Sequence, residues 1–245
     1  MRPSMWIRRF VVAGLIFCAG ISNAASDALP RGFVYLRDAV PDISQDMRYA
    51  SRDNFMRKRL PGYGARECVL TQDAAKALGK VQNAAVSAGY SLVVFDCYRP
   101  QQAVDAMVAW VNSGKGTDPA YYPNVSRAHL IRQGYIGAKS SHAGGSTVDV
   151  SLELLSGSGP KPDTPSACAR KDRETADFGT PFDCFDPASR TGSKAVAVSA
   201  QNMRRTLVAL MQRGGFRNYP GEWWHFTLQG EPFPGKAFDF TIERR

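Results

Sequence analysis

Runs of apolar residues predict a set of short strands along the chain. Some of these runs are rich in β-branched and aromatic residues, and others alternate apolar and polar side chains, as half-buried strands do. The expected strands cover residues 33–36, 91–96, 150–154, 223–228 and 237–242. Between them, the polar and aromatic stretch 46–55 is expected to form an ordered loop.

An alanine-rich stretch from Gln72 to Ser87 predicts the first long helix. Thr71 precedes it, and a threonine hydroxyl at this position can accept a hydrogen bond from the first helical turn. Gly89 follows it, and glycine is common just after the last helical residue. The sequence therefore predicts a helix over 72–87 that is capped at both ends.

Two further helices are expected. Pro100 can open a helix over Gln101–Val111, because proline is well tolerated in a first turn. A third helix is expected over Ala200–Arg213, with Ser199 as its cap and a pair of glycines at its end. Residues 157–177 are rich in glycine, proline and serine and predict a long surface loop.

The order of these elements, β, α, β, α, β, α, β, indicates the fold class. It predicts a single α+β domain with a central, largely antiparallel sheet flanked by helices. No internal repeat is evident in the sequence. The residues from 25 to 245 suit one domain with its own hydrophobic core.

The first 24 residues have the pattern of a secretory signal peptide. Three arginines precede the apolar run 10–21, and small residues follow it up to Ala24. The run is short for a membrane span, so cleavage after about Ala24 is preferred over an uncleaved anchor. We therefore expect export to the periplasm, with no stable membrane insertion after cleavage.

The charge and the cysteines fit an exported protein. The formal net charge is +9, and it falls to +6 when the three arginines of residues 1–24 are removed. No basic-aromatic motif for nucleic acid accompanies this charge. Four cysteines remain after cleavage, and an even number in an exported chain favours disulfides, for which three pairings exist. We prefer Cys68–Cys97 and Cys168–Cys184.

The segment 140–149 reads SSHAGGSTVD and contains a candidate pair of metal ligands. Its two glycines suit a tight loop that returns His142 to the side of Asp149. An imidazole and a carboxylate are ligands that zinc accepts, but a third ligand must come from elsewhere. The alternative is that Asp149 only orients His142 through a structural hydrogen bond.

A second motif, Glu222-Trp-Trp-His225, offers the missing ligand. Three protein ligands leave the fourth position of zinc for water, and a nearby carboxylate can take the proton of that water. Residues three apart lie on opposite faces of an ideal strand, so we expect a turn or bulge here. Without the first motif, His225 would more often be a packed histidine. The remaining histidine, His129, is interpreted as structural.

Together the two motifs resemble the zinc D-Ala-D-Ala metallopeptidases, most closely the VanX-type D-alanyl-D-alanine dipeptidases. The resemblance extends over nearly the whole chain after residue 24. Further matches, in order, are Tyr49-Ala50-x-x-Asp53-Asn54-Phe55, Asp96-x-Tyr98-Arg99-Pro100, Tyr121-Tyr122-Pro123-Asn124, Phe182-Asp183 and Phe238-Asp239-Phe240.

The resemblance implies one zinc ion per chain, held by His142, Asp149 and His225. It also implies that Glu222 is the catalytic base. The chain departs from the family motif at Thr147, where alanine is frequent, and it differs from the cytoplasmic resistance enzymes in its export signal and cysteines. These differences concern the physiological role more than the chemistry.

The remaining site residues also come from the resemblance. Arg99 matches the arginine that stabilises the transition state, although a simple loop pair with Asp96 is an alternative. Ser140 matches a residue near the substrate carboxylate. Tyr49 and Asp183 match groups around the substrate amine.

Three functions are consistent with these residues. The first is a zinc dipeptidase acting on D-Ala-D-Ala in the cell envelope, in peptidoglycan turnover or in a role like glycopeptide resistance. The second is a zinc D,D-carboxypeptidase or endopeptidase that trims longer stem peptides. The third is a non-catalytic, zinc-stabilised wall-binding module. Glu222 argues against the third, because a binding module has no use for a base beside its metal.

Overall fold

The structure is a computed structural model that describes residue 1 and residues 29–156, 166–172 and 175–244. Residues 2–24 of the predicted signal peptide, and residues 157–165 and 173–174 of the predicted loop 157–177, lie outside the described residues. Within the described part of the chain, no helix is long and apolar enough to cross a membrane.

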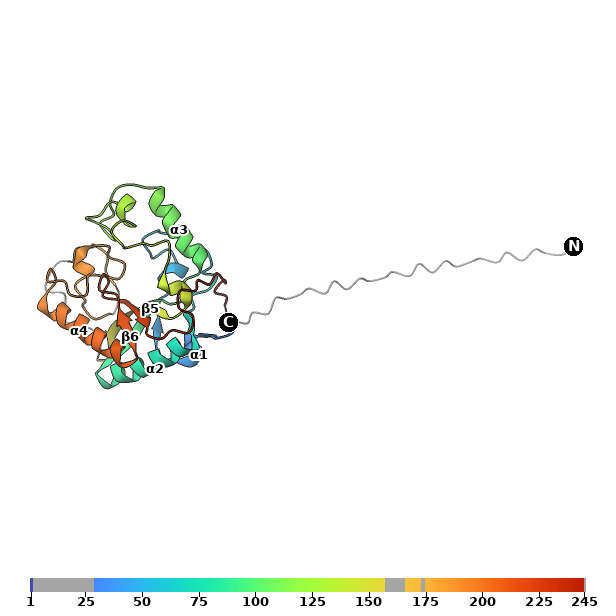
Figure 1. Ribbon diagram of the computed structural model, residues 1–245, viewed down its shortest axis with the longest axis horizontal. Helices are drawn as coiled ribbons and strands as arrows, with labels where there is room; N and C mark the ends of the chain where they lie inside the picture. Colours follow the sequence, from blue (N-terminus) through green and yellow to red (C-terminus); the bar gives the residue numbers. More distant parts are fainter. Residues whose placement is uncertain (2–28, 157–165, 173–174, 245) are drawn as a thin grey trace.

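A β-sheet lies at the centre of the fold (Figure 1). It has five strands, and all but one of its strand pairs are antiparallel. The exception is the edge strand β2, which pairs parallel to β4. In sheet order the strands are β2 (Ser44–Gln45), β4 (Tyr90–Asp96), β5 (Thr147–Leu154), β7 (His225–Leu228) and β6 (Phe216–Asn218). With its helices, this sheet confirms the predicted α+β fold.

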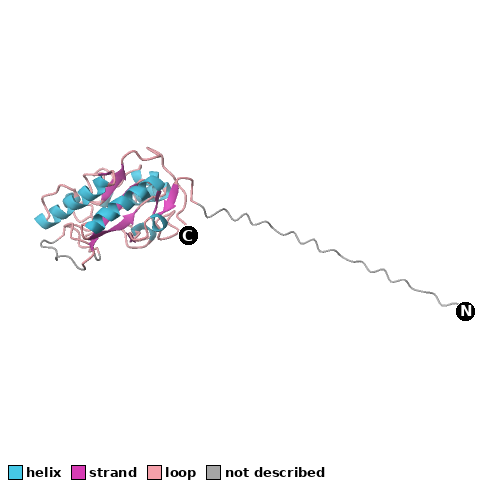
Figure 2. Ribbon diagram, turned by 90° about the horizontal axis from the view of Figure 1, so that it is seen from below, coloured by secondary structure: helices cyan, strands magenta, loops and turns pink. Residues whose placement is uncertain are grey.

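Helices α2 (Gln72–Ser87) and α4 (Val198–Arg213) pack against each other and against the sheet, and Figure 2 shows long helices lying across the strands. The other elements are shorter. They are α1 (Leu36–Ala39), α3 (Gln101–Asn112), the strand pair β1 (Phe33–Tyr35) and β3 (Val69–Thr71), and the 3₁₀ turns η1 (Arg48–Ala50), η2 (Arg127–His129), η3 (Ser141–Gly144) and η4 (Pro187–Ser189).

Helix α2 has the predicted bounds and cap. The hydroxyl oxygen of Thr71 accepts a hydrogen bond from the N–H of Ala74 at 3.3 Å. Leu78, Val81 and Ala85 are buried, at the spacing that places them on one face. This face covers the sheet, so the helix is stabilised by packing as well as by its cap.

The predicted start of α4 is wrong. The helix begins at Val198, and Ala197 occupies the N-cap position with extended backbone angles (φ −53°, ψ 151°). Ser199 therefore lies inside the first turn instead of capping it. Burial of Ala200 and Leu207 sets the position of this helix, so packing outweighs the local preference of serine for a cap.

The predicted strand at 237–242 is also wrong. This segment lies entirely in the described part of the chain and forms no strand there. Its backbone bonds to the start of α3 and to a loop instead: the carbonyl of Phe238 accepts from the N–H of Gln101 at 3.0 Å, and the N–H of Ile242 donates to the carbonyl of Gly62 at 2.8 Å. The alternating aromatic side chains of the segment pack on Phe33, which explains the strand-like pattern.

Both disulfides have the predicted pairing. Cys68–Cys97 joins the approach to β3 with the residue after β4, and the Cα atoms are 5.4 Å apart. Cys168–Cys184 joins the described segment 166–172 to the loop before η4, with a Cα separation of 5.8 Å. Each bond therefore fixes a segment that lies close to the site described next.

Candidate metal centre and active site

The ends of three neighbouring strands bring the candidate ligands together. In the pairing of β5 with β7, Asp149 lies directly opposite His225. On the other side of β5, Asp149 lies opposite Asp96, the last residue of β4. His142 reaches the same place from η3, the turn that leads into β5.

Gly145 makes the return from η3 to β5 feasible. Its φ is +78°, in the left-handed region that side chains disfavour. A Cβ atom at this position would lie 2.3 Å from the ring of Phe33. The predicted tight loop between His142 and Asp149 thus depends on a glycine at 145.

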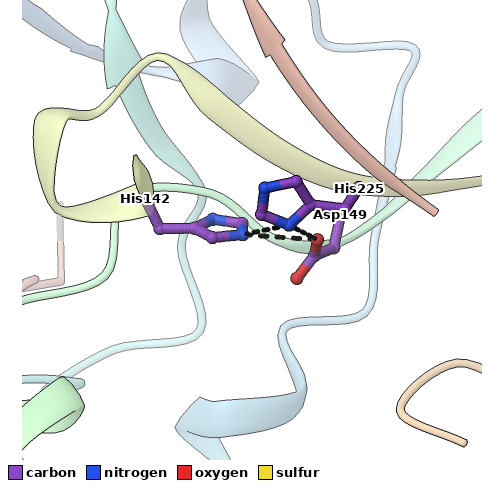
Figure 3. Close-up of side chains that lie close together, drawn as sticks. All are labelled: His142, Asp149 and His225. Carbon is purple, nitrogen blue, oxygen red and sulfur yellow. Dashed lines mark hydrogen bonds and ion pairs between the residues drawn. The ribbon is translucent and has the colours of Figure 1, made fainter. Parts of the chain in front are cut away.

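The three candidate ligand atoms form a nearly equilateral triangle (Figure 3). Nε2 of His142 is 3.3 Å from Nδ1 of His225 and 3.3 Å from Oδ1 of Asp149. Nδ1 of His225 is 3.2 Å from the same carboxylate oxygen. This oxygen is buried and has no hydrogen-bond partner, which leaves its lone pairs for a cation. The donor set and its geometry therefore fit a metal ion.

Both imidazoles are oriented by their second nitrogen. Nδ1 of His142 lies 2.7 Å from the carbonyl oxygen of Cys97, so it carries the proton and leaves the lone pair of Nε2 facing the centre. Nε2 of His225 lies 3.2 Å from the hydroxyl of Ser141. Each ring is therefore held with one nitrogen toward the other ligands.

Electrostatics favour the protonation states that a cation needs. Burial alone would raise the pKa of Asp149, but the imidazoles of His142 and His225 hold that pKa below its usual range. Burial lowers the pKa of His225 from its ordinary value. The centre thus combines an ionised carboxylate with an imidazole that is easily kept neutral.

A turn before β7 places Glu222 beside His225. The side-chain amide of Asn218 donates to the carbonyls of Glu222 and of His225, both at 3.0 Å, and the N–H of Glu222 donates to Tyr219 at 3.1 Å. This confirms the expected turn, and β7 begins at His225 instead of at residue 223. Oε2 of Glu222 lies 3.6 Å from Nδ1 of His225. Burial, followed by the charge of Asp149, raises the pKa of Glu222 well above its usual value.

Arg99 both pairs with Asp96 and faces the centre. Its Nε donates to Oδ2 of Asp96 at 2.9 Å, and its NH2 group is 3.5 Å from Oδ2 of Asp149. Tyr63 donates to the other oxygen of Asp96 at 2.7 Å. The guanidinium lies over the ring of Tyr49, 4.9 Å from the ring centre. Asp96 therefore fixes the direction of Arg99 without removing it from the site.

Tyr49 and Asp183 form a buried pair across from the candidate ligands. The hydroxyl of Tyr49 donates to the carboxylate of Asp183, at 3.0 and 3.1 Å from its two oxygens. Burial, followed by the charge of Asp149, raises the pKa of Asp183 well above its usual value. The pair thus places a buried carboxyl group in the lining of the cavity described below.

One cavity of about 280 Å³ connects these groups. Its lining includes aromatic rings as well as most of the predicted site residues. Those residues are Tyr49, Arg99, Ser140, Asp149, Asp183, Glu222 and His225. His142 closes the triangle of ligand atoms behind them, whereas His129 lies in η2, outside the group of three.

Comparison with known proteins identifies the family. The model of the D-Ala-D-Ala dipeptidase family matches residues 30–243. The chain belongs to this family. D-alanyl-D-alanine dipeptidases of Enterococcus faecium and Streptomyces coelicolor are 34% and 36% identical to it, and each alignment covers 86% of this chain and 98% of the relative. The D-alanyl-D-alanine dipeptidase of Escherichia coli is 32% identical over 82% of this chain and 87% of its own length.

For this member of the dipeptidase family, sequence reasoning missed the residues that support the site. The sequence indicates Asp96 only as an alternative partner for Arg99, although its position in the same short motif is a signal for a supporting role. Tyr63 and the carbonyl of Cys97 had no signal, because their contacts join segments that are far apart in the sequence. Of the predicted metal-binding, catalytic and substrate-binding residues, all but His142 line one cavity, and His142 lies in contact with Asp149 behind it.

Proposed function

We propose that this protein is an exported zinc dipeptidase that hydrolyses D-Ala-D-Ala to two D-alanines. The observation that carries the proposal is the triangle of His142, Asp149 and His225 beside the buried carboxylate of Glu222. The names of the relatives support this substrate. The three relatives described above are D-alanyl-D-alanine dipeptidases, and each alignment covers most of the relative's length.

Zinc is the metal that best suits this donor set. Ligand atoms about 2.0–2.1 Å from zinc, at tetrahedral angles, lie about 3.3–3.4 Å from one another. The observed separations are 3.2 to 3.3 Å. When bound, zinc would act as a Lewis acid toward the scissile carbonyl and make water a better nucleophile at neutral pH.

Glu222 is the proposed proton carrier. It takes a proton from the attacking water and returns it to the leaving amine. A raised pKa suits both steps, because a group that must accept and then donate works best when its pKa is near the working pH. The turn at residues 219–222 fixes this carboxylate next to the ligand His225.

Arg99 is the proposed stabiliser of the transition state. Its guanidinium keeps free donors toward the cavity while Asp96 holds its Nε. Negative charge that develops on the carbonyl oxygen would therefore meet a cation that needs no reorganisation. A planar group with several donors suits this task better than an ammonium group.

The two charged ends of a dipeptide have matching partners in the cavity. Asp183 supplies a carboxylate for the ammonium group, and Ser140 supplies a hydroxyl near the position proposed for the substrate carboxylate. The cavity volume of about 280 Å³ is just below the range of pockets for drug-sized ligands, about 300–1,000 Å³. This size favours a dipeptide over a polymer of the cell wall.

Export to the periplasm is the proposed setting, where a role in peptidoglycan turnover or in a resistance-like process would provide the substrate. The pattern of residues 1–24 supports it, and so do the two disulfides, which persist in oxidising compartments. Sequencing the N-terminus of the protein from a periplasmic fraction tests this. A chain that starts near residue 25 is expected, and a chain that starts at Met1 in the cytoplasm would contradict export.

The function is tested by supplying the zinc-loaded protein with D-Ala-D-Ala, L-Ala-L-Ala and a pentapeptide stem that ends in D-Ala-D-Ala. Release of D-alanine from the first substrate alone is expected. Release from the stem but not from the dipeptide would favour the carboxypeptidase. Zinc binding without turnover of any substrate would favour the binding module.

A further inference from the structure

Asp183 has an unusual backbone conformation for a residue with a side chain. Its φ is +60°, and Arg57 is the one other non-glycine residue with a positive φ in the described part of the chain. Residues held in this region cluster at functional sites, and they persist only where neighbouring structure holds them. Arg57 is exposed, whereas Asp183 is buried. Neighbouring groups must therefore hold the backbone of Asp183 in this conformation.

On the N-terminal side of Asp183, the carboxylate of Asp172 holds the backbone of the preceding residue, Phe182. The N–H of Phe182 donates to Oδ2 of Asp172 at 2.6 Å. The other oxygen, Oδ1, receives the guanidinium of Arg48 at 3.1 Å and that of Arg170. The Asp172 side chain is only 6% exposed, so these bonds are shielded from water.

On its C-terminal side, Asp183 is held by a covalent bond. Cys184 follows it directly and forms the disulfide with Cys168. Cys168 and Asp172 belong to the same described segment, 166–172. This one segment therefore fixes the residues on both sides of Asp183, although neither Asp172 nor Cys168 lines the cavity.

The turn η1 connects this support to the side chain of Asp183. Arg48 binds Asp172, and the next residue, Tyr49, donates its hydroxyl to the carboxylate of Asp183. The Arg48 side chain is 3% exposed and also lies over the ring of Phe95. A movement of Asp172 would thus affect both the backbone of Asp183 and the tyrosine that orients its carboxylate.

We propose that Asp172 is a positioning residue for recognition of the substrate ammonium group. Through the Phe182 N–H and Arg48, it keeps Asp183 in the left-handed conformation that turns its carboxylate into the cavity. The inference rests on the function proposed above, in which Asp183 binds the ammonium group. It adds that the selectivity for a free amino terminus is determined partly by a residue that never contacts the substrate.

The test compares D-Ala-D-Ala with N-acetyl-D-Ala-D-Ala, which lacks the ammonium group. The ratio of kcat/KM for these two substrates measures recognition of the free amine. In Asp172→Ala this ratio is expected to fall about tenfold through KM, since misplacement of a binding group by about 1 Å can cost up to about 10²-fold. The kcat for D-Ala-D-Ala and the zinc content are expected to change little, because Glu222 and the ligands are not in contact with Asp172.

Asp53→Ala is the matched control. Asp53 pairs with the same two arginines, at 3.1 Å from Arg48 and 3.0 Å from Arg170, but it is 61% exposed and does not contact Phe182. Its ratio is expected to equal that of the unmodified protein. An equal fall in both variants would overturn the proposal, because the effect would then follow from removing any carboxylate beside the two arginines and would not be specific to Asp172.

Asp172→Asn provides a second variant if Asp172→Ala does not fold. It keeps the volume and an acceptor oxygen but loses the charge that strengthens the bonds, so the ratio is expected to fall about threefold. A folded Asp172→Asn protein with an unchanged ratio would overturn the proposal.

Asp183→Asn separates this inference from the proposed function. If the unmodified protein does not cleave D-Ala-D-Ala, or if Asp183→Asn keeps the full ratio, the proposed function or the role of Asp183 is wrong. If both behave as expected but the Asp172 variants match the unmodified protein, only the positioning role fails.

Discussion

The imidazole of His142 donates a hydrogen bond from Nδ1 to the backbone carbonyl of Cys97, over 2.7 Å. Cys97 follows the last residue of β4 and is joined to Cys68 by a disulfide. One ring of the candidate metal centre is therefore oriented by a main-chain atom whose own position is fixed covalently. We therefore expect the Cys68–Cys97 disulfide to affect the affinity of this centre for a metal ion.

Removal of the Cys68–Cys97 disulfide should weaken zinc binding as well as the fold. In Cys68→Ala/Cys97→Ala, loss of the cross-link is expected to lower the free energy of unfolding by about 3–4 kcal/mol on the loop-entropy model. A more mobile backbone at residue 97 should also weaken the hydrogen bond that orients His142, so the Kd for zinc should rise. Urea unfolding and zinc titration measure the two effects.

The double variant Cys168→Ala/Cys184→Ala is the control. Its free energy of unfolding should fall by about 3 kcal/mol, but its zinc affinity should stay unchanged. Equal zinc affinity in both variants would contradict the link to His142.

Removal of the metal should abolish activity but leave the protein folded. The strands that present the ligands are held by backbone hydrogen bonds, and two disulfides remain. Zinc that binds only the folded state stabilises it by about 2.7 kcal/mol at 100 times its Kd. A chelator should therefore lower the Tm and stop turnover, and added zinc should restore both. Turnover that continues in the chelated protein, with zinc absent by elemental analysis, would rule out a metal mechanism.

Glu222→Gln should keep the metal and lose turnover. The amide has nearly the same shape but cannot accept a proton from water, and a positioned acid–base group contributes about 10²–10⁴-fold to rate. The kcat is expected to fall within this range, with zinc content unchanged by elemental analysis. Unimpaired kcat in a zinc-loaded variant would exclude Glu222 as the base.

Arg99→Lys should lower kcat more than it changes KM. Lysine keeps the charge, but it cannot donate to Asp96 and to the substrate in the same fixed arrangement as the guanidinium. Loss of one preorganised donor costs about 10²–10³ in kcat. Steady-state kinetics measure this, and Arg57→Lys, at an exposed pair with Asp118, serves as the control. A variant in which KM rises while kcat stays unchanged would assign Arg99 to substrate binding.

Binding of D-Ala-D-Ala should weaken as the pH falls, and at a higher pH than for an ordinary aspartate. The pKa of Asp183 is raised by burial, so this carboxylate takes up a proton above the usual aspartate range. The protonated form is neutral and attracts the substrate ammonium less, so KM should rise through the raised pKa as the pH falls. In Asp183→Asn, KM should be higher than in the unmodified protein above this pKa, should approach the same value below it, and should lack this pH dependence. The same pH profile in both proteins would assign the titration to another group.

The sequence was sufficient to predict the group of candidate metal ligands, because these residues occur in short motifs. His142 and Asp149 are separated by a glycine turn, and Glu222 and His225 by two residues, so local spacing carried the information. The support of these residues was not predictable in the same way. Asp96, Tyr63 and Asp172 act through partners that only the folded chain brings near. Their residue types alone are those of ordinary loops and strand ends.

The errors in secondary structure have a similar physical origin. Residues 237–242 alternate aromatic and polar side chains, but the aromatic rings pack on Phe33 while the backbone bonds to the start of α3 and to a loop. Ser199 has the chemistry of a cap, yet tertiary packing starts the helix at Val198, two residues earlier than predicted. By contrast, α2 has a cap, a buried face and a glycine end that all agree, and its bounds were predicted correctly.

Asp149 pairs directly with His225, so a cation held by both residues would require the correct alignment of β5 and β7. Alternate residues of a strand point to opposite faces, so a slip of β7 by a single residue along β5 would send one of the two ligands to the wrong side of the sheet. A mispaired chain would then lack a complete set of ligands. Zinc supplied during refolding should therefore select the correctly aligned chains and increase their yield.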